Sequence, residues 1–461
     1  MSRVKDVSEE SASTTLCQAL ERDLKLEEIL EPESASGILK RPLSVGTAHS
    51  TVSKFAEREH TARLTAPTSE LRDIGRGSCG SVFEIPGTAH AIKKGTDVRS
   101  IWNDFNLTNL AHNSCVASTN LFKYSFPNPQ IPRVPKAEMY NSPESEDWWR
   151  FNLLRFPKAD RTEAAVFYLD RILPVTEITR YALVNKFFLP DTKIQQAVLG
   201  NIDNQDCLIR LYFGKHKPDD SMYKEDDTLR NFPLYLDQAK AIDIDINNYA
   251  REMAIGLAIL HWEAQIDAAD TEFVIGTSTT KLFGLHYENH QSMMLPRSTM
   301  ENFTQRETQL WMLDYDKCIK ISFETSNWDQ DVVHPYYVAV TGNDPYFPHP
   351  CLDIKLWQIF RQAYLKASHI IIKNRNLRKE MMKLPDRVIE RWEIWGNDNL
   401  ATEEEDFDPF DRTDDGTYEA EEGTDSENED DSEEESDIEE DEDITDDEDS
   451  TAEDDSEDTE Q

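Results

Sequence analysis

A glycine-rich segment followed by a lysine is the stretch of this chain best suited to chemistry. Gly75, Gly77 and Gly80 form a G-x-G-x-x-G set. Val82 follows two residues later, and Lys93 ends the apolar run after the next Pro-Gly turn. Glycine lets a backbone bend and approach a phosphate closely. We therefore predict two antiparallel strands that begin at a glycine turn, with Lys93 facing the same cleft as the glycines.

The residues after the glycines distinguish two kinds of phosphate site. A dinucleotide-binding fold would continue into a helix, with an acidic residue about twenty positions further on. Here the sequence Ala91-Ile92-Lys93 follows on a predicted strand instead. That order resembles the glycine-rich loop and strand lysine of protein kinases.

A helix predicted over residues 100–112 must position a carboxylate against this lysine. Its apolar residues repeat at helical spacing, and Asp104 stands where kinases carry a glutamate. Asp104 is one methylene shorter, so an ion pair with Lys93 requires a closer helix or a bridging water. The alternative is that Asp104 is a solvated helix charge.

Two later segments resemble kinase catalytic motifs. The pattern H-R-D-x-x-x-x-N lies over residues 265–272, so the resemblance implies Asp267 as the catalytic base and Glu272 as a metal ligand. The D-F-G position falls on Asp314, which the resemblance implies as the second magnesium ligand. Asp267 and Asp314 are otherwise read as cap or turn residues.

The same segments depart from the kinase pattern. Gln265 and Ile266 replace His and Arg, and Ala269 replaces the lysine that usually steadies the transferred phosphate. Asp316 replaces the glycine of D-F-G. We therefore expect a nucleotide site for ATP and Mg²⁺ with a degenerate phosphotransfer centre.

The order of the elements predicts the architecture. We expect an α+β, two-lobed protein-kinase-like fold with a small β-rich N-lobe, residues 67–175, and a larger helical C-lobe, residues 176–398. Residues 1–66 are rich in polar residues and are predicted to be mostly disordered, as is the acidic tail, residues 399–461.

Within the lobes, some elements are clearer than others. The hinge strand is expected at residues 165–171, with residues 207–213 as the competing candidate. The strongest helical patterns cover residues 248–262 and 353–367. Residues 276–312 form a polar stretch without strong periodicity.

The charge of the chain is unevenly distributed. The net charge is −42, but residues 401–461 hold 35 acidic residues and one arginine. The remainder carries a net −8, which is ordinary for a globular protein. Neither part favours nucleic acid, and no apolar stretch is long enough for a membrane span. We expect a cytoplasmic or nuclear protein whose tail either binds a basic protein partner or only maintains solubility. Four serines followed by acidic residues are predicted phosphorylation sites: Ser426, Ser432, Ser436 and Ser456.

More narrowly, the chain resembles a fungal family of unknown function, some of whose members carry a zinc finger label. The phrases that suggest it lie at residues 207–214, 266–274, 310–316 and 343–350. We predict no zinc site, because the six cysteines are widely spaced without a C-x-x-C pair. His286 and His290 have no cysteine nearby and are read as surface residues.

Three functions remain open on the sequence. The first is a degenerate, pseudokinase-type module that binds nucleotide or a partner. The second is an active atypical phosphotransferase that uses Asp267, Asp314 and Glu272 with magnesium. The third is an acidic, chaperone-like interaction protein whose folded part is a scaffold.

Overall fold

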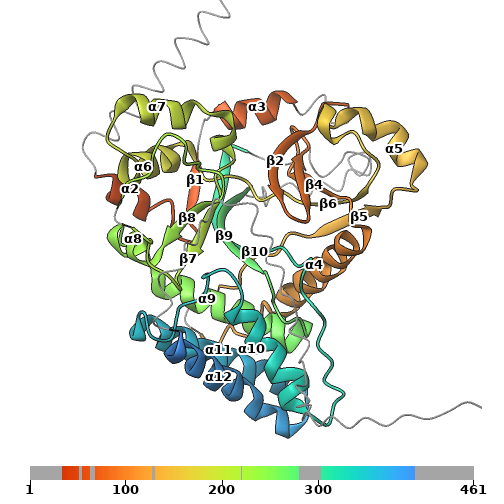
Figure 1. Ribbon diagram of the computed structural model, residues 1–461, viewed down its shortest axis with the longest axis vertical. Helices are drawn as coiled ribbons and strands as arrows, with labels where there is room; N and C mark the ends of the chain where they lie inside the picture. The colour runs from red at the N-terminus through yellow and green to blue at the C-terminus, as the bar shows by residue number, and fades with distance from the viewer. Residues whose placement is uncertain are drawn as a thin grey trace, which may run out of the picture. The chain divides into compact units, whose positions relative to one another are not determined.

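The computed structural model describes residues 34–50, 54–62, 68–126, 130–219, 221–279 and 303–399. All of them belong to one compact unit, Met1–Asp415, and the second unit, Gly416–Gln461, lies outside the described residues. The chain is a mixed α+β structure with a β-rich N-terminal part and a helical C-terminal part (Figure 1). The predicted phosphorylation sites, His286 and His290 also lie outside the described residues.

The first sheet contains the glycine-rich segment. Its strands lie in the order β2-β3-β4-β6-β5, and every neighbouring pair is antiparallel. The bounds are β2 Arg72–Gly77, β3 Gly80–Glu84, β4 His90–Gly95, β5 Ala137–Asn141 and β6 Ala165–Asp170. The strand pair predicted within residues 67–93 and the strand predicted at 165–171 are therefore present, and β2 adds a strand before the glycine turn.

Alternating residues of β6 explain how this sheet is covered on both faces. Ala165 and Phe167 pack with Ile101 of helix α4 (Val98–Ser118), whereas Val166 packs on the opposite face with Trp149 of α5 (Glu146–Asn152). This follows from the two-residue period of a strand. Asp97 caps α4 by accepting hydrogen bonds from the amides of Arg99 and Ser100. The predicted helix is therefore fixed against the sheet that carries Lys93.

A second sheet combines an N-terminal strand with four strands that follow β6 in the chain. Its order is β1-β10-β9-β7-β8, with β7 and β8 parallel and the other pairs antiparallel. The bounds are β1 Ala48–Ser50, β7 Ile209–Tyr212, β8 Phe232–Tyr235, β9 Glu272–Thr279 and β10 Gln305–Leu313. The competing hinge candidate thus supplies β7 of this sheet, whereas 165–171 lies in the first sheet. The ends of the stretch that lacked periodicity form β9 and β10, which pair over eight positions.

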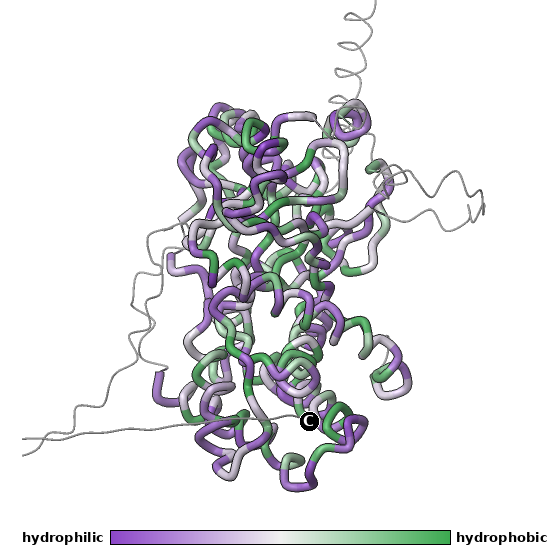
Figure 2. Tube along the Cα trace, turned by 90° about the vertical axis from the view of Figure 1, so that its right-hand side faces the viewer, coloured by the Kyte–Doolittle hydropathy of each residue, from purple (hydrophilic) through white to green (hydrophobic). Residues whose placement is uncertain are grey.

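The helices of the C-terminal part pack below the second sheet (Figure 1). The predicted helices are α9 (Ile246–Ile259), continued by the π turn η4 (Leu260–Ala264), and α11 (Ile354–Asn374), which packs along α9. Pro385 lies in the first turn of α12 (Leu384–Asp398), where a proline loses no intrahelical hydrogen bond. Figure 2 shows that hydrophobic stretches recur in the interior of both parts. The other helical elements that follow α4 are η1 (Leu153–Arg155), η2 (Lys158–Asp160), α6 (Glu177–Phe187), α7 (Thr192–Gly200), η3 (Ile202–Asp206), α8 (Leu236–Ala241), η7 (Asp329–Val333), α10 (His334–Thr341) and η8 (Lys379–Lys383).

The N-terminal segment contains more structure than its composition predicts. Residues expected to be mostly disordered form α2 (Ala35–Lys40), strand β1 and α3 (Lys54–Ala62). Glu59 of α3 is fully buried. Its carboxylate accepts a hydrogen bond from the Gly87 amide at 2.7 Å and lies 3.4 Å from the Arg171 guanidinium. These contacts attach α3 to the first sheet and to the segment that follows β6.

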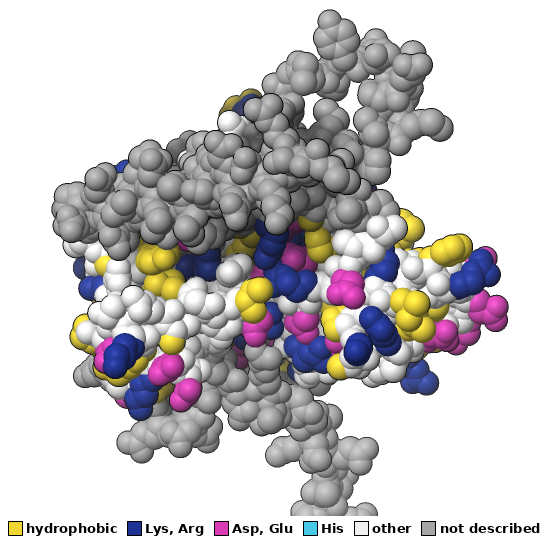
Figure 3. Space-filling view, turned by 90° about the horizontal axis from the view of Figure 1, so that it is seen from above, with side chains coloured by type: hydrophobic (Ala, Val, Ile, Leu, Met, Phe, Trp, Pro, Cys, Tyr) yellow, Lys and Arg dark blue, Asp and Glu magenta, His cyan; other side chains and the backbone are white. Residues whose placement is uncertain are grey.

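The surface carries both signs of charge. On the face seen in Figure 3, basic and acidic side chains alternate over the part drawn in colour. Interspersed charges are typical of a solvated protein surface. Among the described residues, no helix has the length and apolar character that crossing a membrane requires.

Candidate functional site

The glycine-rich segment forms a tight hairpin over β4. Gly77 and Gly80 face each other where β2 and β3 meet. Gly80 has φ +155°, and a Cβ there would lie 2.4 Å from the carbonyl oxygen of Lys94. A Cβ on Gly77 would meet nothing within 4 Å. Gly80 therefore permits close backbone packing, whereas Gly77 leaves open space above the cleft.

Lys93 joins three elements beneath this hairpin. Its Nζ lies 2.7 Å from Asp104 Oδ2 on α4 and 2.7 Å from Asp314 Oδ1 after β10. Burial alone would lower the pKa of Lys93, but Asp104 and Asp314 outweigh it and hold that pKa well above its usual value. The lysine is therefore charged and bound to both carboxylates.

Asp104 reaches the lysine without a bridging water. The Asp104 side chain is 3% exposed, and its second oxygen accepts hydrogen bonds from Thr108 Oγ1 at 2.9 Å and the Tyr315 amide at 3.2 Å. The close approach of α4 thus compensates for the methylene that aspartate lacks.

Asp314 lies at the end of β10 with φ +67°. Burial would raise the pKa of its carboxyl, but the charges of Lys93 and Arg210 lower it below the ordinary value. Its neighbour Asp316 behaves in the opposite way, because burial and the charge of Asp314 raise its pKa to about 6. The D-Y-D segment therefore presents one firmly ionised carboxylate to Lys93.

A cleft of about 400 Å³ lies between the glycine hairpin and the second sheet. Val82, Ala91, Phe167, Leu169 and Leu313 supply apolar lining. The same cleft is lined by every residue predicted to bind cofactor or metal: Gly75, Gly77, Gly80, Val82, Lys93, Asp104, Glu272 and Asp314. Segments separated by more than 200 residues therefore form one site.

Asp267, predicted as the catalytic base, does not line this cleft. It is 5% exposed, and its Oδ1 accepts hydrogen bonds from the amides of Ala269 at 3.3 Å and Ile319 at 3.0 Å. Burial raises the pKa of Asp267 to about 6. Three residues later Asp270 does line the cleft, and it pairs with Lys317 at 3.2 Å. The D-x-x-D spacing is the sequence signal for this second aspartate.

Glu272 meets a cation that the sequence did not identify. Its Oε1 accepts a hydrogen bond from Nη2 of Arg210 on β7, the strand formed by the competing hinge candidate. Burial raises the pKa of Glu272 to about 7, although Arg210 opposes this. Arg210 also lies 3.8 Å from Asp344. Nothing in the local sequence around 210 signals this contact, because 62 residues separate the partners.

Four carboxylates that line the cleft are paired with cations in the part of the chain that the structure describes. Asp104 and Asp314 bind Lys93, Glu272 binds Arg210, and Asp270 binds Lys317. Within the described ranges, no group of three or more His, Cys, Asp or Glu side chains has the geometry to hold a metal ion. The donor set of the cleft therefore does not fit the magnesium that the kinase resemblance implies.

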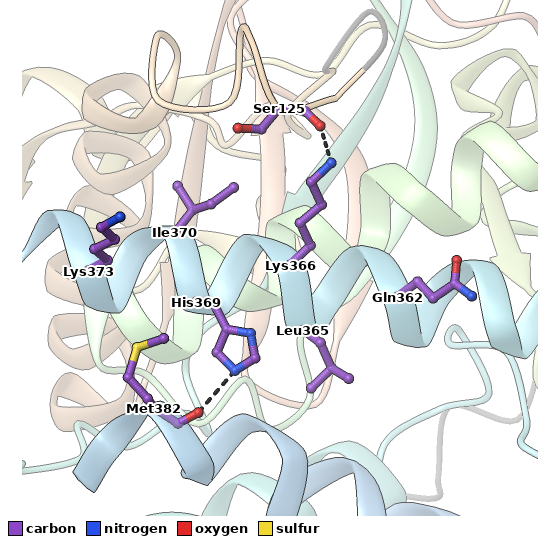
Figure 4. Close-up of a pocket in the computed structure, with 8 residues that line it drawn as sticks. All are labelled: Ser125, Gln362, Leu365, Lys366, His369, Ile370, Lys373 and Met382. Atoms are coloured by element: carbon purple, nitrogen blue, oxygen red, sulfur yellow. Dashed lines mark hydrogen bonds between the residues drawn. The ribbon is translucent and has the colours of Figure 1, made fainter. Parts of the chain in front are cut away.

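A shallow hollow elsewhere on the protein is a weaker candidate. It lies along α11, where Lys366 donates a hydrogen bond to the Ser125 carbonyl and His369 contacts the Met382 carbonyl at 3.0 Å (Figure 4). None of the residues predicted to bind or react lines it. The cleft under the glycine hairpin is thus the candidate site.

A comparison with known protein families gives a match to part of the chain. Residues 310–376 match a family model described as "Zinc finger protein" (DUF3669). A search of curated proteins found no match. The matched stretch runs from β10 through α11 and contains Asp314 and Asp344, but it excludes the glycine hairpin and Lys93. Its two cysteines make separate contacts, Cys318 with Ala269 and Cys351 with Asn397.

Proposed function

We propose that this protein is a kinase-like, catalytically degenerate domain that binds a nucleotide in the cleft beneath the glycine hairpin. The observation that carries the proposal is the position of Lys93, which binds Asp104 on α4 and Asp314 after β10 at 2.7 Å each. In kinases a strand lysine, a helix carboxylate and a post-strand aspartate are brought together in this way around the phosphates.

The cleft offers separate surroundings for the two ends of a nucleotide. The apolar side chains of Val82, Ala91 and Leu313 suit a flat base. Lys93 and the open space at Gly77 suit the phosphates, since glycine lets backbone amides approach them closely. The order of the first sheet, with α4 packed on one face, supports the same interpretation.

The position of Asp267 supports binding without efficient transfer. A general base must lie within hydrogen-bond reach of the proton that it removes. Asp267 instead accepts hydrogen bonds from two backbone amides, and it does not line the cleft. Ala269 provides no charge for the transferred phosphate. The carboxylate is therefore assigned a structural role.

Thermal unfolding of the full chain with and without ADP or ATP tests the proposal. A nucleotide at about 100 times its Kd stabilises a folded protein by about 2.7 kcal/mol. We expect this stabilisation in the wild type and its loss in Lys93→Met. The matched control is Lys94→Met on the same strand, because Lys94 is equally buried but binds Thr162 outside the cleft.

A second variant separates loss of binding from loss of fold. Ala91→Leu fills the apolar part of the cleft without changing charge, so it should abolish the nucleotide effect while Lys93 keeps both partners. Absence of any shift with ADP, ATP or GTP in a folded wild-type protein would refute nucleotide binding and leave the interaction-protein hypothesis.

An active phosphotransferase is the second candidate, and Asp270 favours it. This carboxylate lines the cleft, and 43% of its side chain is exposed. It is therefore accessible to a substrate hydroxyl where Asp267 is not. Nucleotide turnover by the wild type that is lost in Asp270→Asn and retained in Asp267→Asn would establish this activity.

A further inference from the structure

Glu272 occupies the position of a metal-binding residue but contacts a guanidinium. Its oxygen binds Arg210 Nη2, and both side chains are largely buried, at 17% and 18% exposed. Burial would lower the pKa of Arg210, but Glu272 outweighs this and raises it well above the ordinary value, so the guanidinium keeps its charge. A metal ion at Glu272 would have to displace this partner.

Arg210 is held in place and retains capacity for a ligand. Its Nη1 lies 3.5 Å from Tyr212 Oη and 3.8 Å from Asp344 Oδ2, while Tyr212 donates to Asp344 at 3.0 Å. Its buried Nε has no hydrogen-bond acceptor among the described residues. Arg210 lines the cleft together with Lys93 and Lys317. With Arg76, Arg171 and Arg230 they make six cationic side chains in the lining of the cleft.

Three carboxylates that line the cleft are already paired with cations, where a divalent ion would have to compete for them. Lys93, Arg210 and Lys317 each bind at least one of Asp314, Glu272 and Asp270. Magnesium holds its water tightly and requires near-octahedral oxygen ligands, so it competes poorly for carboxylates already paired in this way. A planar guanidinium, in contrast, is weakly hydrated and matches phosphate oxygens through two parallel hydrogen bonds.

We infer that Arg210, anchored by Glu272, replaces the second metal ion of a kinase-like site, so that the nucleotide's phosphates bind without a divalent metal. The inference rests on the proposed nucleotide binding and specifies its cofactor requirement. In this arrangement Arg210 on β7 and Lys93 on β4 approach the phosphates from opposite walls of the cleft. Arg210 is thus a residue that determines specificity for the metal-free form of the ligand.

The test is the affinity of the full chain for ADP measured by calorimetry in excess Mg²⁺ and in EDTA. We expect the two dissociation constants to agree within about threefold. Arg210→Met should raise the dissociation constant for ADP in EDTA about tenfold or more, because the loss of a charge-assisted hydrogen bond has an effect of this size. Arg133→Met is the control, since Arg133 also faces a glutamate, Glu307 at 3.8 Å, but lies outside the cleft lining.

The outcomes separate the inference from the proposed function. ADP binding that requires Mg²⁺ would overturn the inference and leave nucleotide binding intact. An unchanged affinity in folded Arg210→Met would also overturn it. Failure to bind ADP in both conditions would remove the inference and the proposed function together. If Arg210→Met does not fold, the comparison of Mg²⁺ with EDTA on the wild type still decides the question.

Discussion

Lys93 Nζ and Asp104 Oδ2 lie 2.7 Å apart, so an aspartate on α4 reaches the lysine of β4 directly. The pair is largely buried, with 11% of the lysine and 3% of the aspartate side chain exposed. Removing one partner of such a pair leaves a buried charge with incomplete compensation.

Asp104→Asn should therefore destabilise the protein. Lys93 keeps Asp314, so we expect a loss of about 1–3 kcal/mol in the free energy of unfolding, less than for a fully orphaned charge. Urea unfolding measures this change. Asp147→Asn is the control, because its side chain is 88% exposed and its pair with Arg150 should contribute less than about 0.5 kcal/mol. Equal effects of the two variants would contradict the bridging role of Asp104.

The two glycines at the tip of the hairpin should respond differently to alanine. Gly80→Ala places a Cβ 2.4 Å from a backbone carbonyl, so the hairpin must move, and we expect a cost of about 1–3 kcal/mol. Gly77→Ala meets open space and should change stability by less than about 1 kcal/mol. Thermal unfolding of both variants compares them directly. A larger loss in Gly77→Ala would show that the hairpin packs differently.

Arg171 connects helix α3 to the first sheet. Its guanidinium, 1% exposed, contacts Glu59 of α3 and Glu84 of β3. Arg171→Met leaves both carboxylates without this partner, so we expect a loss of about 3–5 kcal/mol. Arg150→Met on α5, where the arginine side chain is 66% exposed, should lie within about 0.5 kcal/mol of the wild type. Limited proteolysis within residues 54–62 should accelerate only in the first variant.

Asp267 is expected to support the loop and not to contact the ligand. Asp267→Asn weakens the acceptor of the Ala269 and Ile319 amides, which should cost about 1–3 kcal/mol of stability. The dissociation constant for ADP should change by less than about threefold. Unfolding and calorimetry on the same preparation check both statements. A large loss of affinity for ADP without loss of stability would show that Asp267 contributes to ligand binding.

Glu252 on α9 should make stability depend on pH. Burial raises its pKa to about 8 against an ordinary 4.5, and the opposing effect of Arg133 is smaller. The folded state therefore binds more protons than the unfolded state between these values, and stability falls as pH rises from about 4.5 to 8.

Glu252→Gln should remove this loss. A shift of this size corresponds to about 5 kcal/mol, so the stability of the variant relative to the wild type should increase progressively as pH rises. Urea unfolding at several pH values measures the difference, in which the titration of the acidic tail cancels. Parallel pH profiles of the two proteins would contradict a neutral, buried Glu252.

Local sequence patterns were sufficient to predict the strands and the helix that surround the glycine-rich segment. The spacing of Gly75, Gly77 and Gly80, the apolar run to Lys93 and the helical period around Asp104 each concern residues close in the chain. Such patterns report which face of a strand or helix is buried, because side-chain direction follows the backbone period. The residues that these patterns single out do line the cleft.

Only the tertiary structure decided which partner each charged group meets. Arg210 reaches Glu272 through pairing of β7 with β9, and Glu59 reaches Arg171 across 112 residues. Asp267 turns into the loop because Gln265, Ala268 and Asp270 adopt positive φ angles, which composition does not reveal. The sequence alone determined a glycine hairpin, its lysine and the carboxylates available to it. Long-range strand pairing and loop conformation determined which of them face the cleft, since neither leaves a periodic trace in the chain.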